Sequence, residues 1–234
     1  MIWLEAVACS LADAIGAQRV GARRIELVSA IEVGGITPSL GVFQMVKEKC
    51  GLMCMTMVRP RGGGFCYSSA EFEIMCRDAA LLVEAGTDGI VCGIQEDDGD
   101  LDWRRMERLA EIAGSRQKVC HRCFDTTPDP FEALRALIDI GFDRVLTSGQ
   151  QKSALDGADL IKALIEKAEG KIEIMPGGWL RSSNVADIVQ RTGCRSVHLG
   201  PMKEVASATT TAVSYGTYPE LDLAEIEAAA QALR

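Results

Sequence analysis

The chain has 234 residues, of which 47% are hydrophobic and 25% charged, and its formal net charge is -8. This is the composition of a globular protein with a substantial core, which excludes extensive disorder. The acidic balance and the lack of a basic run argue against a nucleic-acid partner. The first residues do not resemble a secretory signal, and no stretch approaches about 20 consecutive apolar residues. We therefore expect a cytoplasmic protein without a membrane partner.

Short apolar runs alternate with amphipathic stretches along the whole chain. Because each run is too short for a stable helix, the alternation indicates βαβ units and a parallel sheet. The predicted strands cover residues 3–7, 24–28, 53–58, 89–92, 118–121, 144–147, 171–175 and 195–199. Eight evenly spread strands predict an α/β fold, a single (β/α)₈ TIM barrel over residues 1–234.

The predicted helices are followed by glycines that mark where each helix ends. In the segment around residues 130–142, Phe131, Leu134, Leu137 and Ile138 share one predicted face, and Gly141 ends the helix. The pattern "glycine, polar residues, strand" recurs in GARRIEL, GTDGIVC, GFDRVLTS and GCRSVHLG. This recurrence is typical of one βα unit per repeat. Residues 201–221 break the rhythm and predict an irregular connection before a last helix at residues 222–233.

Charged residues inside the predicted strands indicate the site. The outward faces of barrel strands lie under helices and are apolar, so a charge within a strand points inward or lies at its end. By alternation, Glu5 turns inward from the first strand, and Arg24 and Glu26 turn inward from the second. Two buried carboxylates need cations or a metal nearby.

Candidate cations and glycines follow other strands. They are Arg59 and Arg61 in RPRGGGFCYS, His121 and Arg122 in CHRCFD, His198 in the last strand, and Gly177 with Gly178 in MPGGWLR. Active sites of this fold lie at the carboxyl ends of the strands, where such groups bind a small anion. The alternative is a network of salt bridges that only fills the barrel mouth.

The nine cysteines are dispersed and odd in number, which does not describe a disulfide framework. Most of them are expected to be small buried hydrophobic residues. Cys120 and Cys123 form a CxxC pair, but a second pair for a structural zinc site is missing. Thiolates and imidazole also suit Cu(I). On an extended strand the two thiols would face opposite sides, so chelation requires the strand to end between them.

The segments IELVSAIEVGGITPSLGV, RPRGGGFCYS, CHRCFD, DRVLTSGQ with ALDG, and MPGGWLR resemble the signature blocks of the CutC copper-homeostasis family, in family order, over residues 1 to about 200. The resemblance implies a cytosolic (β/α)₈ barrel that assembles as a homodimer or higher homo-oligomer and binds copper. The residues that match are Glu5, Glu26, Arg59, Arg61, His121, Arg122, Asp125, Thr147, Ser148, Gly149, Gly177, Gly178 and His198. Val7 and Val28 stand where many relatives have a cysteine, and valine offers no ligand.

Three hypotheses about function follow from this pattern. The first is a copper-homeostasis protein that binds a copper ion, with Cys9, Cys66, Cys120 and Cys123 as the remaining thiols. The second is an enzyme for a small anionic substrate, a carboxylate or a phosphate. Its predicted catalytic residues are Glu5, Glu26, His121 and Asp125, and its predicted binding residues are Arg59, Arg61, Arg122, Thr147, Ser148, Gly149, Gly177, Gly178 and His198. The third is a purely structural or oligomeric scaffold.

Overall fold

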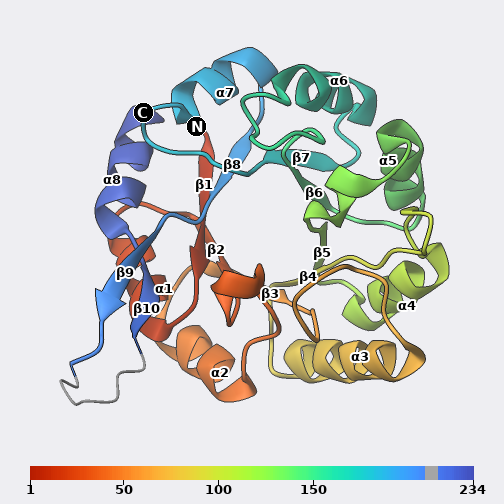
Figure 1. Cartoon of the computed structure of the whole chain (residues 1–234), viewed down its shortest axis with the longest axis horizontal. Helices are drawn as coiled ribbons and strands as arrows, with labels where there is room; N and C mark the ends of the chain where they lie inside the picture. The colour runs from red at the N-terminus through yellow and green to blue at the C-terminus, as the bar shows by residue number, and fades with distance from the viewer. Residues whose placement is uncertain (209–215) are drawn as a thin grey trace.

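A computed structural model describes residues 1–208 and 216–234. Eight parallel strands form a ring surrounded by helices, so the predicted TIM barrel is confirmed (Figure 1). The strands are β1 (Trp3–Ala8), β2 (Arg24–Leu27), β3 (Met53–Met57), β4 (Gly89–Cys92), β5 (Gln117–Cys120), β6 (Arg144–Thr147), β7 (Glu173–Pro176) and β8 (Ser196–Leu199). Each lies within two residues of its predicted position.

Helices and short 3-10 turns connect these strands. The helices are α1 (Leu11–Arg19), α2 (Leu40–Lys49), α3 (Ser69–Glu84), α4 (Trp103–Ala113), α5 (Pro130–Asp139), α6 (Ala158–Ala168), α7 (Val185–Thr192) and α8 (Leu223–Ala232), with 3-10 turns η1 (Ile31–Val33) and η2 (Arg122–Thr126). Among the described residues, no helix combines the length and the apolar character that crossing a lipid bilayer requires.

Strand pairing closes the ring in the order of the chain. Each strand from β1 to β6 pairs with the next, and β8 pairs with β1. A single parallel bridge between Gly177 and His198 joins the β7 and β8 ends. Because all eight strands run in one direction, their carboxyl ends meet at one rim, and the connections after them surround a common mouth.

Alternation along the strands separates two cores, and the outward apolar face is the one that the sequence predicted. Outward residues such as Leu4 and Ile25 belong to the large core beneath the helices. The barrel interior contains a smaller apolar cluster of Val7, Val28, Met55, Met57, Val91 and Val119. Val7 and Val28 thus fill the barrel with apolar side chains next to the inward charges of β1 and β2.

Helix α5 forms where the sequence predicted it and ends before Gly141. Its Leu134 and Leu137 are fully buried, and Gly141 follows the helix end with a φ of +79°. Phe131, however, is 40% exposed. Phe131 lies in the first turn of the helix, so the shared face becomes buried only from Leu134 onwards.

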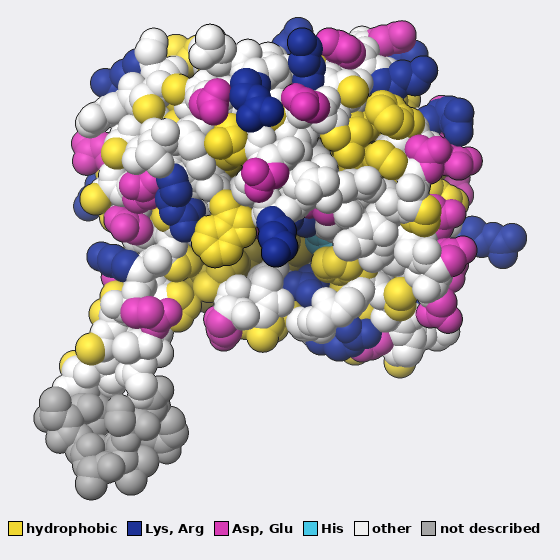
Figure 2. Space-filling view, turned by 45° about the horizontal axis from the view of Figure 1, so that its top comes forward, with side chains coloured by type: hydrophobic (Ala, Val, Ile, Leu, Met, Phe, Trp, Pro, Cys, Tyr) yellow, Lys and Arg dark blue, Asp and Glu magenta, His cyan; other side chains and the backbone are white. Residues whose placement is uncertain are grey.

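The connection after β8 is more regular than the sequence indicated. Strands β9 (Met202–Ala206) and β10 (Thr217–Leu221) form an antiparallel hairpin that projects away from the barrel (Figures 1 and 2). The predicted irregular connection at residues 201–221 is therefore wrong in its two flanks, while residues 209–215 lie outside the described part of the chain. Asp13 fixes the base of the hairpin, because its Oδ1 accepts a hydrogen bond from the N–H of Leu221.

Candidate functional site

Glu5 is the centre of a buried ionic cluster in the barrel. It is 1% exposed, and its two carboxylate oxygens have different partners. Oε2 accepts from Arg24 Nε on the neighbouring strand, and Oε1 lies 2.8 Å from His198 Nδ1 on β8. Strand register explains this meeting, since Glu5 is the Cα partner of both Arg24 and His198.

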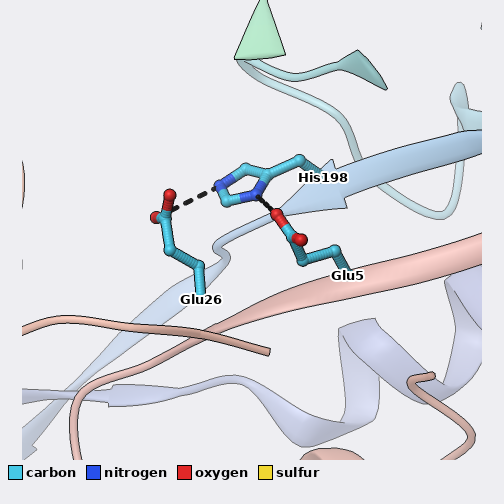
Figure 3. Close-up of side chains that lie close together, drawn as sticks. All are labelled: Glu5, Glu26 and His198. Carbon is cyan, nitrogen blue, oxygen red and sulfur yellow. Dashed lines mark hydrogen bonds and ion pairs between the residues drawn. The ribbon is translucent and has the colours of Figure 1, made fainter. Parts of the chain in front are cut away.

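Glu26 approaches the same histidine from the opposite side. Its Oε2 lies 3.9 Å from His198 Nε2, and Figure 3 shows the imidazole between the two carboxylates. Among the described residues, Glu5, Glu26 and His198 form the one group of three histidine, cysteine or acidic side chains whose ligand atoms all lie within 4.8 Å of one another. The sequence therefore predicted correctly that both carboxylates enter the interior from adjacent strands.

The cluster shifts the pKa of each of its members. Burial alone would raise the pKa of Glu5, but the ion pair with Arg24 and the hydrogen bond with His198 outweigh burial, so this pKa lies well below its usual range. For Glu26, burial dominates and raises the pKa despite the nearby imidazole. Burial opposes the charged form of His198, yet Glu26 and Glu5 raise its pKa. Both carboxylates therefore favour the protonated form of His198.

His121 lies beside this cluster with a different electrostatic character. Its ring is 4% exposed and packs against Phe65, with ring centroids 4.7 Å apart. Nδ1 accepts a hydrogen bond from the N–H of Cys123, which leaves the proton of the neutral ring on Nε2, a buried atom without a partner. Burial, followed by the charge of Arg59, lowers the pKa of His121 to about 4. His121 is therefore a neutral hydrogen-bond donor at neutral pH.

The two arginines of RPRGGGFCYS bind carbonyls of their own loop and partners in neighbouring segments. Arg59 donates to the carbonyls of Val33, Gly35 and Gly63. Arg61 pairs with Glu71 of α3 and donates to carbonyls of residues 62, 64 and 66. Neither forms a described ion pair with Glu5 or Glu26. Arg24 has that role instead, a residue that strand alternation turned inward but that we did not assign to the site.

A second polar network joins the ends of β5 and β6. Arg122 Nε donates to Asp125 Oδ2 at 2.8 Å, and Arg122 Nη2 donates to Ser148 Oγ at 2.7 Å. Asp125 also accepts from Thr147 Oγ1 and from the N–H groups of Ser148 and Gln150. The predicted residues Arg122, Asp125, Thr147 and Ser148 therefore meet, but their donors and acceptors are largely satisfied by one another.

The predicted glycines allow close approach around this network. A Cβ on Gly149, whose φ is +68°, would overlap the carbonyl of Gly157. Gly177 forms the bridge that closes the ring beside His198, and Gly178 has a φ of +108° and lies against Arg122. Only glycine combines such backbone angles with this little space. In the structure these three glycines allow close packing of the backbone.

The four cysteines named from the sequence fall into separate places. Cys9 is half-buried at the end of β1, and Cys66 is exposed and donates to the carbonyl of Glu96. Cys120 and Cys123 are fully buried, with their Sγ atoms 3.7 Å apart. β5 ends at Cys120 and η2 begins at Arg122, so the strand does end between the two thiols, as their approach requires.

A further thiol next to this pair was missed. Cys92 ends β4 and is the Cα partner of Cys120 in the parallel pairing of β4 and β5. Burial, followed by the nearby Cys120, raises the pKa of the Cys92 thiol. Cys92 ends one predicted strand and Cys120 lies one residue before the end of the next, but the register between strands was not assigned.

The mouth of the barrel is hollowed at the surface. Figure 2 shows a histidine side chain at the bottom of a depression, with basic side chains at its edge. His198 retains 11% side-chain exposure, whereas the carboxylates of Glu5 and Glu26 retain 2% and 6%. A small molecule or ion entering the mouth therefore meets the imidazole more readily than either carboxylate.

Comparisons with known proteins agree on one family. The model of the CutC family matches residues 2–203. Family protein CutC of Treponema denticola is 45% identical over 230 residues, covering 96% of this chain and 94% of that protein. The human copper homeostasis protein cutC homolog is 43% identical, covering 83% of this chain and 71% of its own. The crystal structure of CutC from Streptococcus agalactiae superimposes with a TM-score of 0.82 at 34% identity, covering 86% of this chain and 98% of that one.

Proposed function

Because the chain belongs to the CutC family, we propose that it serves in copper homeostasis by binding Cu(I) through Cys120 and Cys123. The observation that carries the proposal is the 3.7 Å separation of the two Sγ atoms at the end of β5. Thiolates are the soft ligands that Cu(I) prefers. The human relative bears the name of a copper homeostasis protein, which supports copper as the cargo.

The surroundings of the thiol pair favour a soft monovalent ion. Cys120 and Cys123 lie in the apolar core, and Cys92 on the adjacent strand offers a third sulfur. No carboxylate forms a described hydrogen bond with either thiol. A low-dielectric site of this kind penalises a doubly charged ion more than a singly charged one.

Copper loading at this pair is coupled to proton release. The hydrogen bond with Cys123 and burial raise the pKa of Cys120 well above its usual value. Cu(I) binds the thiolate, so each ion must displace thiol protons. The apparent affinity is therefore expected to rise with pH throughout the neutral range.

The experiment is a Cu(I) titration of the reduced protein against a competing chromophoric Cu(I) chelator. Cys120→Ser and Cys123→Ser should each lose tight binding, whereas Cys66→Ser and Cys9→Ser should retain it. Cys194→Ser is the matched control for a buried thiol distant from the pair. Wild-type affinity in the double variant Cys120→Ser/Cys123→Ser would remove the proposal.

A second candidate function is acid–base chemistry on a small anionic substrate at the mouth. One specific observation favours it: His198 lies between Glu26, whose pKa is raised, and Glu5, whose pKa is lowered. Paired groups with divergent pKa values supply an acid and a base. A thermal-shift screen of carboxylates and phosphates tests it, because a ligand of the native state raises apparent stability. Unchanged shifts in Glu26→Gln would contradict it.

The proposal extends to the location, the oligomeric state and the partners of the protein. We infer a cytoplasmic location and a homodimer or higher homo-oligomer, with a copper ion or a small anion as ligand and neither nucleic acid nor membrane as partner. Light scattering on the purified protein measures the oligomer, and fractionation of cells measures the location.

A further inference from the structure

A cavity of about 820 Å³ opens at the end of the barrel opposite the mouth. It is lined by the first residues of six strands, which are Trp3, Arg24, Met53, Gln117, Arg144 and Glu173. The segments that precede β7 and β8 complete the wall, with Ile172 and Arg195 among their residues. This end of a TIM barrel usually serves stability, so an open cavity with charged walls there is unexpected.

Arg144 is the polar anchor of the cavity. It is 3% exposed, its Nε donates to Glu173 Oε2 at 2.6 Å, and its Nη2 donates to Gln117 Oε1 at 3.1 Å. Its Nη1 is buried and has no hydrogen-bond partner. A charged donor left without an acceptor costs free energy, which a bound acceptor recovers.

The protein's own carboxylates leave this donor free. Glu173 Oε2 is engaged by Arg144 Nε, and Glu173 Oε1 accepts from Ser196 Oγ. Glu5 is engaged by Arg24 and His198. No acceptor within the described residues therefore pairs with Arg144 Nη1, and a bound molecule can supply one.

The other residues that line the cavity indicate which chemical groups of a ligand would fit there. Ile165 and Ile172 line one part of the cavity, and Trp3, 39% exposed, lies beneath the Arg24 guanidinium at 5.7 Å. Three arginines and one glutamate line the cavity, so the charge balance of its walls is positive. A single carboxylate matches a planar guanidinium donor, and an apolar body matches the isoleucines and the indole.

We propose that this cavity binds a small organic monocarboxylate, whose carboxylate oxygen accepts from Arg144 Nη1 and whose apolar body packs against Trp3 and the isoleucines. The site is separate from the thiol pair and from the mouth, and it is independent of the function proposed above. Its ligand is recognised by one charge and one apolar face.

The test uses benzoate as the probe and benzamide as its neutral counterpart of similar shape. In the ¹⁵N-labelled full chain, benzoate should shift the Trp3 indole N–H signal in a saturable manner, and benzamide should bind at least about tenfold more weakly, since it lacks the charge that strengthens the hydrogen bond. Arg144→Met should weaken benzoate binding about tenfold or more. Arg108→Met, which removes an exposed arginine of α4, is the matched control and should bind like wild type.

A second variant tests the same cavity in case Arg144→Met does not fold. Ile165→Trp enlarges an apolar wall residue that α6 contributes to the cavity and leaves Arg144, Glu173 and Gln117 in the chain. It should also weaken benzoate binding. The proposal is overturned if benzoate and benzamide bind equally, if the Trp3 signal does not move up to millimolar benzoate, or if a folded Arg144→Met or Ile165→Trp binds benzoate like wild type.

Discussion

The hydrogen bond between Glu5 Oε1 and His198 Nδ1, 2.8 Å long, joins the first strand of the barrel to the last. The same glutamate pairs with Arg24 on the second strand. Three strands are thus tied by one buried carboxylate at the position where the ends of the chain meet in the sheet. Closure of the barrel and organisation of the mouth therefore depend on the same side chain.

Glu5→Gln should be strongly destabilising. The amide keeps the shape of the side chain but leaves Arg24 buried without a counter-charge, a situation that costs about 3–5 kcal/mol. Denaturant unfolding monitored by circular dichroism measures the change in the free energy of unfolding. Glu132→Gln, which removes an exposed ion pair with Arg135 on α5, is the control and should unfold like wild type. Equal stability of both variants would show that the Glu5 cluster contributes little to closure.

His121 should make stability depend on mildly acidic pH. Its folded pKa of about 4 lies below the unfolded value of 6.5. The unfolded chain therefore takes up a proton first, and stability is lost as pH falls from 6.5 towards 4. Over this window the stability of wild type relative to His121→Phe should fall by about 3 kcal/mol. Urea unfolding of both proteins at several pH values measures the difference, and a constant difference would contradict a buried neutral imidazole.

His198 should titrate in the opposite direction. Glu26 and Glu5 raise its folded pKa above 6.5, so its contribution to stability is complete below pH 6.5 and is lost as pH rises through the folded pKa. NMR titration of the ring signals measures this pKa directly. Glu26→Gln should lower it, because the amide carries no charge to favour the imidazolium. Glu111→Gln, on the exposed surface of α4, should leave it unchanged.

The barrel and its inward charges could be predicted because they follow from local rules. Apolar runs place the strands, and alternation turns Glu5 and Glu26 to the interior. The partners of those charges depend on register, which residue order does not specify. Arg24, the Cα partner of Glu5, consequently went unassigned. Arg59 and Arg61, which lie beside glycines, bind loop carbonyls and Glu71, and their predicted contact with an anion stays a prediction.

The hairpin after β8 was missed for a different reason. Its strand Met202–Ala206 has no buried residue, so no apolar alternation marks it. The pairing of Cys92 with Cys120 was missed because it depends on the register between β4 and β5, which local alternation does not specify.

Gly93→Ala should disturb the thiol pair and His121 together. A Cβ at this position would overlap Cys123 Sγ and lie 2.5 Å from His121 Cε1. Overpacking of a filled core costs about 1–3 kcal/mol. The thermal unfolding temperature and the affinity for Cu(I) should therefore both fall. Gly41→Ala is the control, since nothing lies within 4 Å of its Cβ and alanine favours the helix α2 in which it lies.

Asp125→Asn should loosen the connection that follows β6. Asp125 receives the N–H groups of Ser148 and Gln150 together with the hydroxyl of Ser148 and the guanidinium of Arg122. Loss of the charge weakens each of these bonds, because hydrogen bonds to a charged acceptor are about twice as strong as neutral ones. Amide hydrogen exchange at Ser148 and Gln150 should accelerate at least about tenfold, which corresponds to 1.4 kcal/mol. Exchange within β1 and β2 should stay at the wild-type rate, since the Glu5 cluster is untouched. Acceleration throughout the barrel would instead show that Asp125 supports the whole fold, and wild-type exchange at both amides would show that backbone geometry alone holds the connection.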